Sequence, residues 1–435
     1  MRLPRVLLLL YAAPALPLSL LGLPLTVYLP TFWASSMHMP LAVVGGVLLA
    51  VRSLDVVFDP LIGRLSDRLR GRFGRRKPFI AAGLPIGIAG VAGLFFPPAG
   101  ARAPWLFAFS ALVTLAWTMI ALPYQAWGAE LSDDYAERAR ITSLREGGTI
   151  VGILLSAGAP AVLGVVTPAG SLHILAALAV VLATPMILLM LARVPERVRP
   201  VAGPPVHLWA ALRTAAANGP FRRLLAAWLV NGLANGLPAV LFLLMCSAVI
   251  RRPAAANPVL LAYFLAGILG VPLWMRLAIR FGKHRSWGVA MLLGAAAFAF
   301  VPLLGPGDVL PFLAISVGSG LAFGADMTVP PAIQADVIDL DELQSGEHRA
   351  GLFFAAWTMA QKAGNALAVG IAFPLLALAG FRTGGPNGPA QLGMLVSLYC
   401  GLPIVLKLMA TMLVWRFPID ATEQARIRAA IAARA

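Results

Sequence analysis

Long apolar stretches alternate with short polar segments along the chain. Twelve such stretches are centred near residues 20, 50, 88, 115, 156, 182, 238, 268, 295, 320, 363 and 403. A helix that crosses a bilayer needs about 20 apolar residues, so twelve helices with short connections account for nearly all of the 435 residues. The pattern predicts an all-α integral membrane protein with twelve transmembrane helices, and it leaves no room for a sizeable soluble domain.

The second half of this pattern repeats the first with a shift of 208 or 209 residues. The matching pairs are Gly74 with Gly282, Gln125 with Gln334, and Arg140 with Arg349. We therefore expect two pseudo-symmetric six-helix bundles, residues 1–193 and 221–416, around a central cavity. The longest polar connection, residues 194–220, is the expected cytoplasmic loop between them, and residues 417–435 form the expected cytoplasmic tail.

Composition and charge placement agree with a membrane protein. The chain is 60% hydrophobic and 12% charged, whereas soluble domains are about 25% charged. With a cytoplasmic N-terminus, 26 of the 34 Lys and Arg residues lie in cytoplasmic segments. This bias follows the positive-inside rule; it explains the net charge of +16 without nucleic acid and predicts a multi-pass protein with both termini in the cytoplasm. The preference for Arg over Lys is typical of GC-rich bacterial genomes, and hence of a cytoplasmic (inner) membrane.

Span two carries a cluster of charges at helical spacing. Arg52, Asp55 and Asp59 are separated by three and four residues, which places them on one face of a continuous helix. Two carboxylates on one face in a low dielectric do not both ionise readily. A proton on one of them, a small cation between them, or neutralisation by Arg52 relieves the conflict. The first two outcomes are what ion coupling requires, and a permanent Arg–Asp pair between helices is the structural alternative.

Further polar candidates lie in spans four, five and eleven. Span four offers Thr118 as a candidate cation ligand, and Tyr124 and Gln125 as candidate substrate ligands. A Thr hydroxyl is a suitable oxygen ligand for a small hard cation, although Thr in membrane helices often bonds its own backbone. Arg145, at the start of span five, either reaches the cavity or snorkels to the surface. Lys362, in span eleven, either pairs with a buried Asp or binds a substrate oxygen.

The second half carries its own polar residues. Asn231 and Asn235 are four residues apart in span seven; they either bind substrate hydroxyls or tie helices together. Asp326, in span ten, is one position from the repeat counterpart of Thr118 and is a candidate for the cavity wall. Lys407, in span twelve, is expected to snorkel toward the membrane surface.

The loop after span two contains a Gly-x-x-x-Asp-Arg arrangement formed by Gly63, Asp67 and Arg68. A small residue permits close helix approach, and Asp67 with its Arg neighbours is expected to form a charge latch that gates the cytoplasmic side. Orientation of the chain by positive charge alone is the alternative, and the two roles are compatible.

Three stretches resemble the glycoside–pentoside–hexuronide:cation symporters, the melibiose-permease-like branch of the major facilitator superfamily. They are LDVVFDPLIGRLSDRLRGRFGRRKPFI (54–80), TMIALPYQAWGAELSDDYAERARI (118–141) and ADVIDLDELQSGEHRAGLFFAAWTMAQKAG (335–364). The resemblance implies a cation site on Asp55, Asp59 and Thr118 with Arg52 beside it. It also implies that Arg145 and Lys362 lie near the substrate or the cation carboxylates.

The chain departs from that family at positions that bear on ion and cargo. Phe58 stands where sodium-using members often have Asn, and it offers no oxygen, which favours protons. Ser19 and Ala121 stand where melibiose-type members have acids in spans one and four, so a galactoside-like cargo is in doubt. Ser19 is still expected to contact the substrate. The family also includes lipid-carrying relatives, whose cavities tolerate apolar tails, and the apolar span one fits such a cargo.

These observations predict a cation-coupled secondary transporter, H⁺ or Na⁺, that carries a small and sugar-like solute by alternating access. A coupled transporter of a lipid or other amphiphile is the alternative, and a membrane enzyme or sensor is a remote one. The sequence has no Gly-x-Ser-x-Gly elbow, phosphate-binding loop or metal-ligand spacing among its five His residues. We therefore expect a protein that is not an enzyme, with no cofactor and no metal beyond sodium at the cation site. We also expect it to be a monomer. Its expected partners are the solute, the cation and the bilayer.

Overall fold

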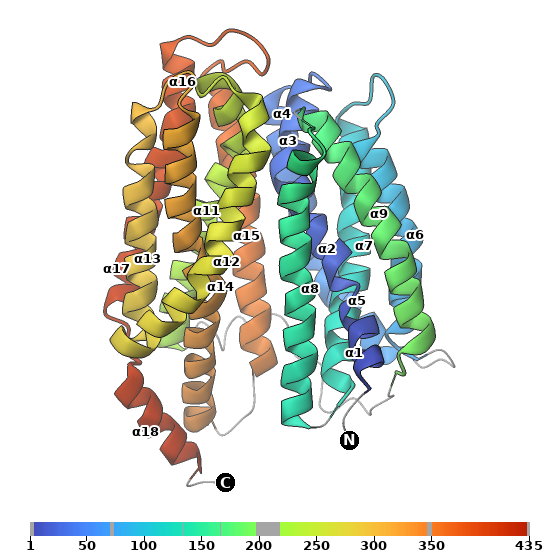
Figure 1. The fold of residues 1–435 in the computed structure, drawn as a ribbon. Helices are drawn as coiled ribbons and strands as arrows, with labels where there is room; N and C mark the ends of the chain where they lie inside the picture. Colours follow the sequence, from blue (N-terminus) through green and yellow to red (C-terminus); the bar gives the residue numbers. More distant parts are fainter. Residues whose placement is uncertain are drawn as a thin grey trace. The chain divides into compact units, whose positions relative to one another are not determined.

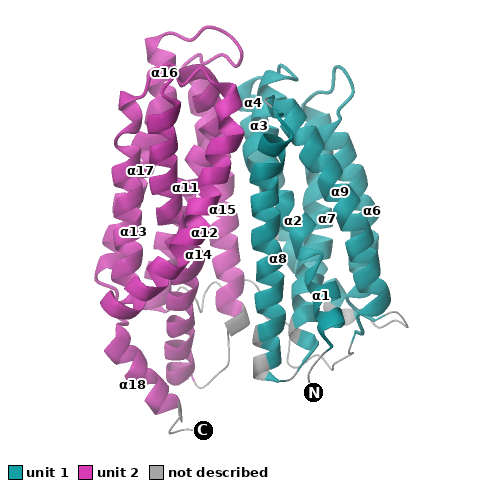
Figure 2. Ribbon diagram, in the orientation of Figure 1, with its two compact units in different colours: residues 1–205 teal, residues 206–435 magenta. Residues whose placement is uncertain are grey.

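The computed structural model describes residues 4–69, 74–132, 134–165, 167–196, 218–345 and 350–432. These residues are helical almost throughout, and they include no strand (Figure 1). The chain divides into two compact units, residues 1–205 and 206–435 (Figure 2).

In the described residues, the first unit contains six successive spans, and the first two of them are cut into shorter helices. Its elements are α1 (Arg5–Ala12), α2 (Ala15–Leu20), the π-helical turn η1 (Pro24–Tyr28), α3 (Leu29–Ser35), α4 (Leu41–Ser53), α5 (Asp55–Arg68), α6 (Lys77–Phe95), α7 (Ala103–Glu130), α8 (Tyr135–Val162) and α9 (Pro168–Arg193).

The second unit follows the same order of long helices and ends in a short helix. Its elements are α11 (Gly219–Leu244), η2 (Met245–Val249), η3 (Pro253–Ala255), α12 (Ala256–Phe281), α13 (Lys283–Phe298), η4 (Val301–Leu303), α14 (Val309–Ser345), α15 (Ala350–Leu378), α16 (Pro389–Val396), η5 (Ser397–Gly401), α17 (Leu402–Trp415) and α18 (Ala421–Ala432).

Eleven segments of the described residues are long and apolar enough to cross a membrane. The remaining predicted span is α8, whose 28 residues carry charges in the first half and an apolar run in the second. The predicted all-α membrane fold is therefore confirmed. The bilayer core offers no water to backbone groups, so continuous helices are the expected solution for segments of this composition.

Two spans are broken, for different reasons. Span one contains Pro14, Pro17, Pro24 and Pro30, and it divides into α1, α2, η1 and α3 because proline removes a backbone donor and clashes with the preceding turn. Span two divides at Leu54. The Leu54 N–H donates to the carbonyl of Val51, three residues back, at 3.0 Å, whereas an α-helical N–H donates to the carbonyl four residues back. This tighter turn ends α4 and begins α5 at Asp55.

In both units, helices approach closely through glycine. In the second unit, a Cβ on Gly324 of α14 would overlap the carbonyl oxygen of Gly267 of α12, and one on Gly320 would overlap that of Tyr263. In the first unit, a Cβ on Gly90 of α6 would lie 2.9 Å from a methyl of Val113 on α7. Small residues at such crossings let helix backbones pack without a large side chain between them.

The internal repeat is visible in the backbone of one turn. Gly74 precedes α6 and Gly282 precedes α13, and both have φ of +91°. An L side chain rarely adopts this conformation, so glycine is required at both turns. In each unit a basic residue next to this turn pairs with an acid on the following helix, as described below.

Adding one methyl group to Gly324 tests the α12–α14 crossing. Gly324→Ala is expected to lower the thermal unfolding midpoint of the purified protein, because overpacking of this kind costs about 1–3 kcal/mol. Gly318→Ala is the matched control, since its Cβ would meet only the Ala297 methyl at 3.6 Å. Equal midpoints for the two variants would show that the crossing is less tight than described.

Candidate functional site

The break in span two positions the first carboxylate of the candidate cation site. Asp55 is the first residue of α5, and it is 5% exposed. An acid in the first turn of a helix is stabilised by the positive end of the helix dipole. Arg52 lies on the other side of the break, at the end of α4, within electrostatic reach of Asp55. The continuous helical face that we expected for the three charges is therefore not observed, because the helix is interrupted between Arg52 and Asp55.

The second carboxylate contacts span four. The Thr118 hydroxyl donates to Oδ1 of Asp59 at 2.9 Å, and Thr118 is 1% exposed. This hydrogen bond joins α5 to α7 across 59 residues of sequence. Thr118 therefore bonds a carboxylate rather than its own backbone, and the site combines two acids four residues apart with a hydroxyl oxygen.

Several predicted substrate ligands of the first unit are engaged in helix packing. Tyr124 and Tyr11 each donate the phenolic hydroxyl to the other's backbone carbonyl, both at 2.8 Å. The Ser19 hydroxyl donates to Leu16 of its own helix at 3.0 Å. Gln125 is exposed, and Arg145 donates to Glu146 at 2.8 Å. The geometry gives Tyr124 and Ser19 structural bonds, and a substrate role for all four residues stays a prediction.

The polar residues of the second unit form one buried network. Oδ1 and Oδ2 of Asp326 accept from Nε1 of Trp287 at 2.6 Å and from Nδ2 of Asn235 at 2.7 Å. On its other side, the Asn235 amide oxygen accepts from Nζ of Lys407 at 2.7 Å. Lys407 also donates to Asn231 at 3.3 Å. The network thus connects α11, α13, α14 and α17.

Lys407 does not snorkel, which corrects the expectation from sequence. It is 4% exposed, and its ammonium points into the unit toward Asn231 and Asn235. A buried ammonium needs acceptors and a nearby negative charge, and the two amides and Asp326 supply them. The side-chain amide of Asn235 lies between Asp326 and Lys407 and bonds to both, so the two charges form an indirect ion pair.

Lys362 lies on α15 of the second unit, where it is half-buried between the exposed Gln361 and Ala363. Its predicted role near the cation carboxylates or the substrate stays a prediction. The described residues contain no group of three or more His, Cys, Asp or Glu that could hold a metal ion.

The predicted latch on the cytoplasmic side is centred on Gly63, Asp67 and Arg68. A Cβ on Gly63 would meet no described atom within 4 Å. The side chains of Asp67 and Arg68 lie outside the described part of the chain. Their predicted gating role therefore stays a prediction.

Two glutamates that the motif does not contain hold this region together. Arg75 and Arg76 both donate to Glu130 at the end of α7, at 2.9 and 2.8 Å. Arg76 also donates to Ser66 of α5 at 2.6 Å. Glu196, after α9, accepts from the backbone N–H groups of Arg75, Arg76 and Lys77 at the start of α6. The second unit has a simpler equivalent, Lys283 with Asp336 at 2.6 Å.

Removing one end of the buried network tests its charge balance. Lys407→Met is expected to destabilise the protein by about 3–5 kcal/mol, because it leaves Asp326 buried without a counter-charge. The double variant Asp326→Asn with Lys407→Met removes both charges and is expected to recover much of this loss. The measurement is the thermal unfolding midpoint in detergent.

The control is Arg426→Ala, which removes an exposed ion pair with Glu423 and is expected to change stability by about 1 kcal/mol or less. A Lys407→Met midpoint as close to the native one as that of Arg426→Ala would contradict the charge-balance interpretation.

Curated relatives of this chain are symporters at low identity. An uncharacterised symporter of Synechocystis is 25% identical, with 84% of each chain covered. The Escherichia coli protein YagG, which is named for glycoside/cation symport, is 26% identical, with 86% of this chain and 83% of the relative covered. The human sodium-dependent lysophosphatidylcholine symporter 1 is 24% identical, with 86% and 76% covered.

Solved structures share the fold. The nucleoside transporter NupG matches with a TM-score of 0.67 and 14% identity over 95% of this chain and all of that one. A bacterial homologue of the human lysosomal transporter Spinster matches with a TM-score of 0.65 over 98% of both chains, at 14% identity. The family model of the MFS/sugar transport proteins matches residues 10–421. Because that match spans nearly the whole chain, this protein belongs to the MFS/sugar transport protein family of the major facilitator superfamily.

Proposed function

We propose that this symporter is driven by protons, which bind at Asp55 and Asp59, and that it carries a small polar solute by alternating access. Symport of the major facilitator type follows from the family and the relatives. The coupling ion, its ligands and the cargo are the proposal. The observation that carries it is the contact between Asp59 and Thr118, beside the buried Asp55.

The chemistry of this contact suits reversible proton binding. A carboxylate in a low dielectric gains from neutralisation, because its charged form is poorly solvated. Arg52 offsets one of the two negative charges, so a proton on the other carboxyl leaves the group neutral. A neutral site crosses an occluded state at lower cost than a charged one. Loss of the proton on the cytoplasmic side then resets the cycle, and the proton gradient drives accumulation.

Protons are favoured over sodium by the ligands that the site offers. A small hard cation prefers several oxygen ligands. Asp55, Asp59 and Thr118 supply oxygens, whereas Phe58, between the two acids, supplies none. Sodium is the alternative ion, since the human relative is named as sodium-dependent.

A sugar-like solute is the first candidate cargo, with Gln125, Arg145, Asn235 and Lys362 as its proposed ligands. A second candidate is an amphiphile, and one observation favours it. Three hydroxyls of span one, Ser19, Thr26 and Ser35, donate to carbonyls of their own helix. They therefore offer few donors to a sugar, and the surface that span one presents is mostly apolar.

Neutralising the two acids tests the coupling. Asp55→Asn and Asp59→Asn are expected to abolish gradient-driven uptake in proteoliposomes, while exchange of solute across the membrane survives, because exchange requires no net ion movement. Thr118→Val is expected to weaken uptake and Thr118→Ser to preserve it, since serine keeps the hydroxyl. Glu423→Gln, on the exposed helix α18, is the matched control. Accumulation at the native level in both Asn variants would show that the acids are structural.

A pH measurement distinguishes protons from sodium as the coupling ion. Addition of solute to cells or proteoliposomes without sodium is expected to make the outside solution more alkaline as protons enter with the solute. The expected Asp59→Asn result is no alkalinisation. Uptake that requires sodium and moves no protons would replace the proton assignment with sodium while leaving symport intact.

Competition separates the two candidate cargoes. A water-soluble glycoside that competes for uptake identifies a polar cargo. Competition only by single-chain amphiphiles identifies the alternative.

A further inference from the structure

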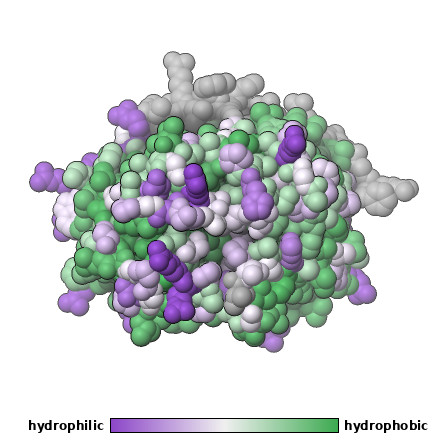
Figure 3. Space-filling model, turned by 90° about the horizontal axis from the view of Figure 1, so that it is seen from above, coloured by the Kyte–Doolittle hydropathy of each residue, from purple (hydrophilic) through white to green (hydrophobic). Residues whose placement is uncertain are grey.

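A cavity of about 600 Å³ lies wholly within the second unit, apart from the residues of the candidate site. Its walls come from η2 and Arg251 just after it, from the connection between α13 and α14, and from the junction of α16 with η5. Figure 3 looks onto the end of the molecule at which α16 begins, where hydrophilic residues lie among hydrophobic ones. Cavities of about 300–1,000 Å³ are typical of small-molecule sites.

Two π-helical turns border this cavity. The turn η2 contributes Val249 to its wall, and η5 contributes Ser397 and Cys400. A π-helical turn inserts an extra residue into a helix, costs stability, and occurs often at functional sites. Two such turns in the wall of one cavity indicate that the helices are shaped around it.

The rim of the cavity carries an arginine in a strained conformation. Arg251 is exposed and has φ of +54°, which non-glycine residues seldom adopt. The connection between α13 and α14, which also lines the cavity, is fixed by hydrogen bonds from the Gly307 N–H to the carbonyl of Ile250 and from the Gly305 N–H to Asp308, both at 2.8 Å. Strain of this kind persists where the surroundings hold it in place, and it clusters at binding sites.

The charge of Arg251 is also unusual for its side of the membrane. In the orientation that the charge bias predicts, this end of the unit faces outward, where only four of the 34 basic residues lie. Such a residue does not help to orient the chain. A negatively charged ligand that binds to Arg251 would explain why a basic residue occurs at this position.

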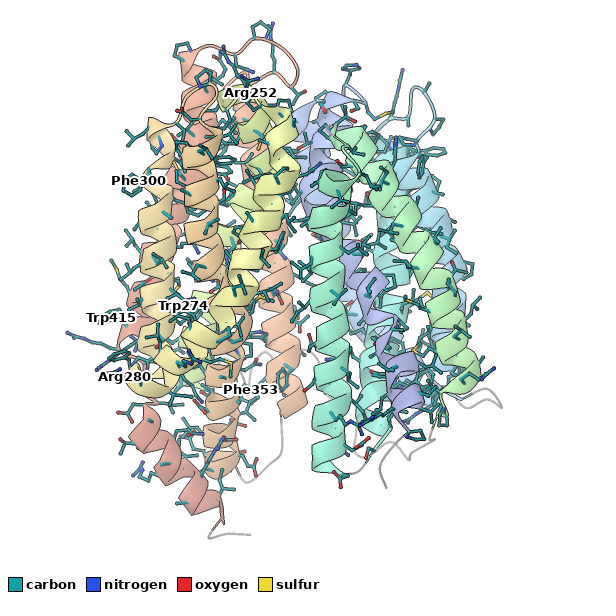
Figure 4. The ribbon with its side chains drawn as sticks, in the orientation of Figure 1. Arg252, Trp274, Arg280, Phe300, Phe353 and Trp415 are labelled. Atoms are coloured by element: carbon teal, nitrogen blue, oxygen red, sulfur yellow. The ribbon has the colours of Figure 1, made fainter. Side chains whose placement is uncertain are left out.

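The rest of the wall is apolar, and so is the adjoining surface. Leu304, Leu392 and Val396 line the cavity. Next to it, Phe300, Leu303 and Leu310 are 59%, 78% and 76% exposed, and Phe300 projects outward from its helix in Figure 4. Exposed apolar side chains of this type are suited to contact with lipid.

We propose that this cavity binds a single-chain amphiphile with an anionic head. The head pairs with Arg251, and the chain lies along Leu304, Leu392 and Val396. Fatty acids and anionic lysolipids share this chemistry, since a carboxylate and a phosphate both accept charge-assisted hydrogen bonds from a guanidinium. The site is independent of the coupling acids and of the cargo.

The test uses a fatty acid that carries a photoreactive diazirine in its chain and the full-length protein in lipid nanodiscs. After illumination, mass spectrometry of peptides is expected to find the label in residues 245–251 and 389–401. Arg251→Gln is expected to reduce this labelling about tenfold at limiting probe, as expected for loss of a charge-assisted bond. Arg251→Lys keeps the charge and is expected to retain most of it.

A second pair of variants tests the cavity rather than the charge. A Cβ on Gly393 would meet nothing within 4 Å. Gly393→Trp is therefore expected to fill the cavity and remove the label, while Gly393→Ala leaves it. Unchanged elution in size-exclusion chromatography shows that each variant is folded.

Competitors of equal chain length identify the head group. Oleate and oleoyl lysophosphatidylglycerol are both expected to displace the probe. The one that displaces it at the lower concentration shows whether the preferred head group is a carboxylate or a phosphate. Neutral monoolein is expected to displace it poorly. Labelling spread evenly over lipid-facing helices in all variants, or equal displacement by monoolein, would overturn the proposal.

Discussion

The cost of a charge that is removed from water determines where the helices of this protein must meet. Each buried ionisable group needs a partner from another helix, because its own helix has no spare donors or acceptors at that depth. The Asp59–Thr118 bond therefore ties α5 to α7. The chain from Asp326 through Asn235 to Lys407 ties α14, α11 and α17. Apolar packing and the glycine crossings supply the remaining contacts.

The sequence was sufficient to predict the spans, because hydropathy over some 20 residues is a strong signal. It also identified Asn231, Asn235 and Asp326 as related polar positions, and family resemblance supplied Thr118. Other features could not be predicted from the sequence. Leu54 interrupts span two without a proline or glycine of its own. The direction of Lys407 depends on the rotation of α17, which charge spacing does not report.

The two units use one plan at their turns and different chemistry at their centres. A glycine with the same positive φ precedes α6 and α13, and a basic residue beside it pairs with an acid in both units. Such pairs depend on local spacing, which the repeat preserves. At the centre, the first unit has two acids and a hydroxyl, whereas the second has an acid and an ammonium joined by an amide. Only the first has an excess of groups that a cation can neutralise.

The amide of Asn235 has a further consequence for the electric field inside the protein. It neither gains nor loses a proton in the physiological range, so it cannot relay one from Lys407 to Asp326. The two opposite charges therefore act at a distance as a dipole, whose potential falls off with the square of distance rather than with distance itself. The network from Asp326 to Lys407 thus gives the second unit a polar interior without adding a net charge of its own, and the electrical work of transport is left to the ion that travels with the cargo.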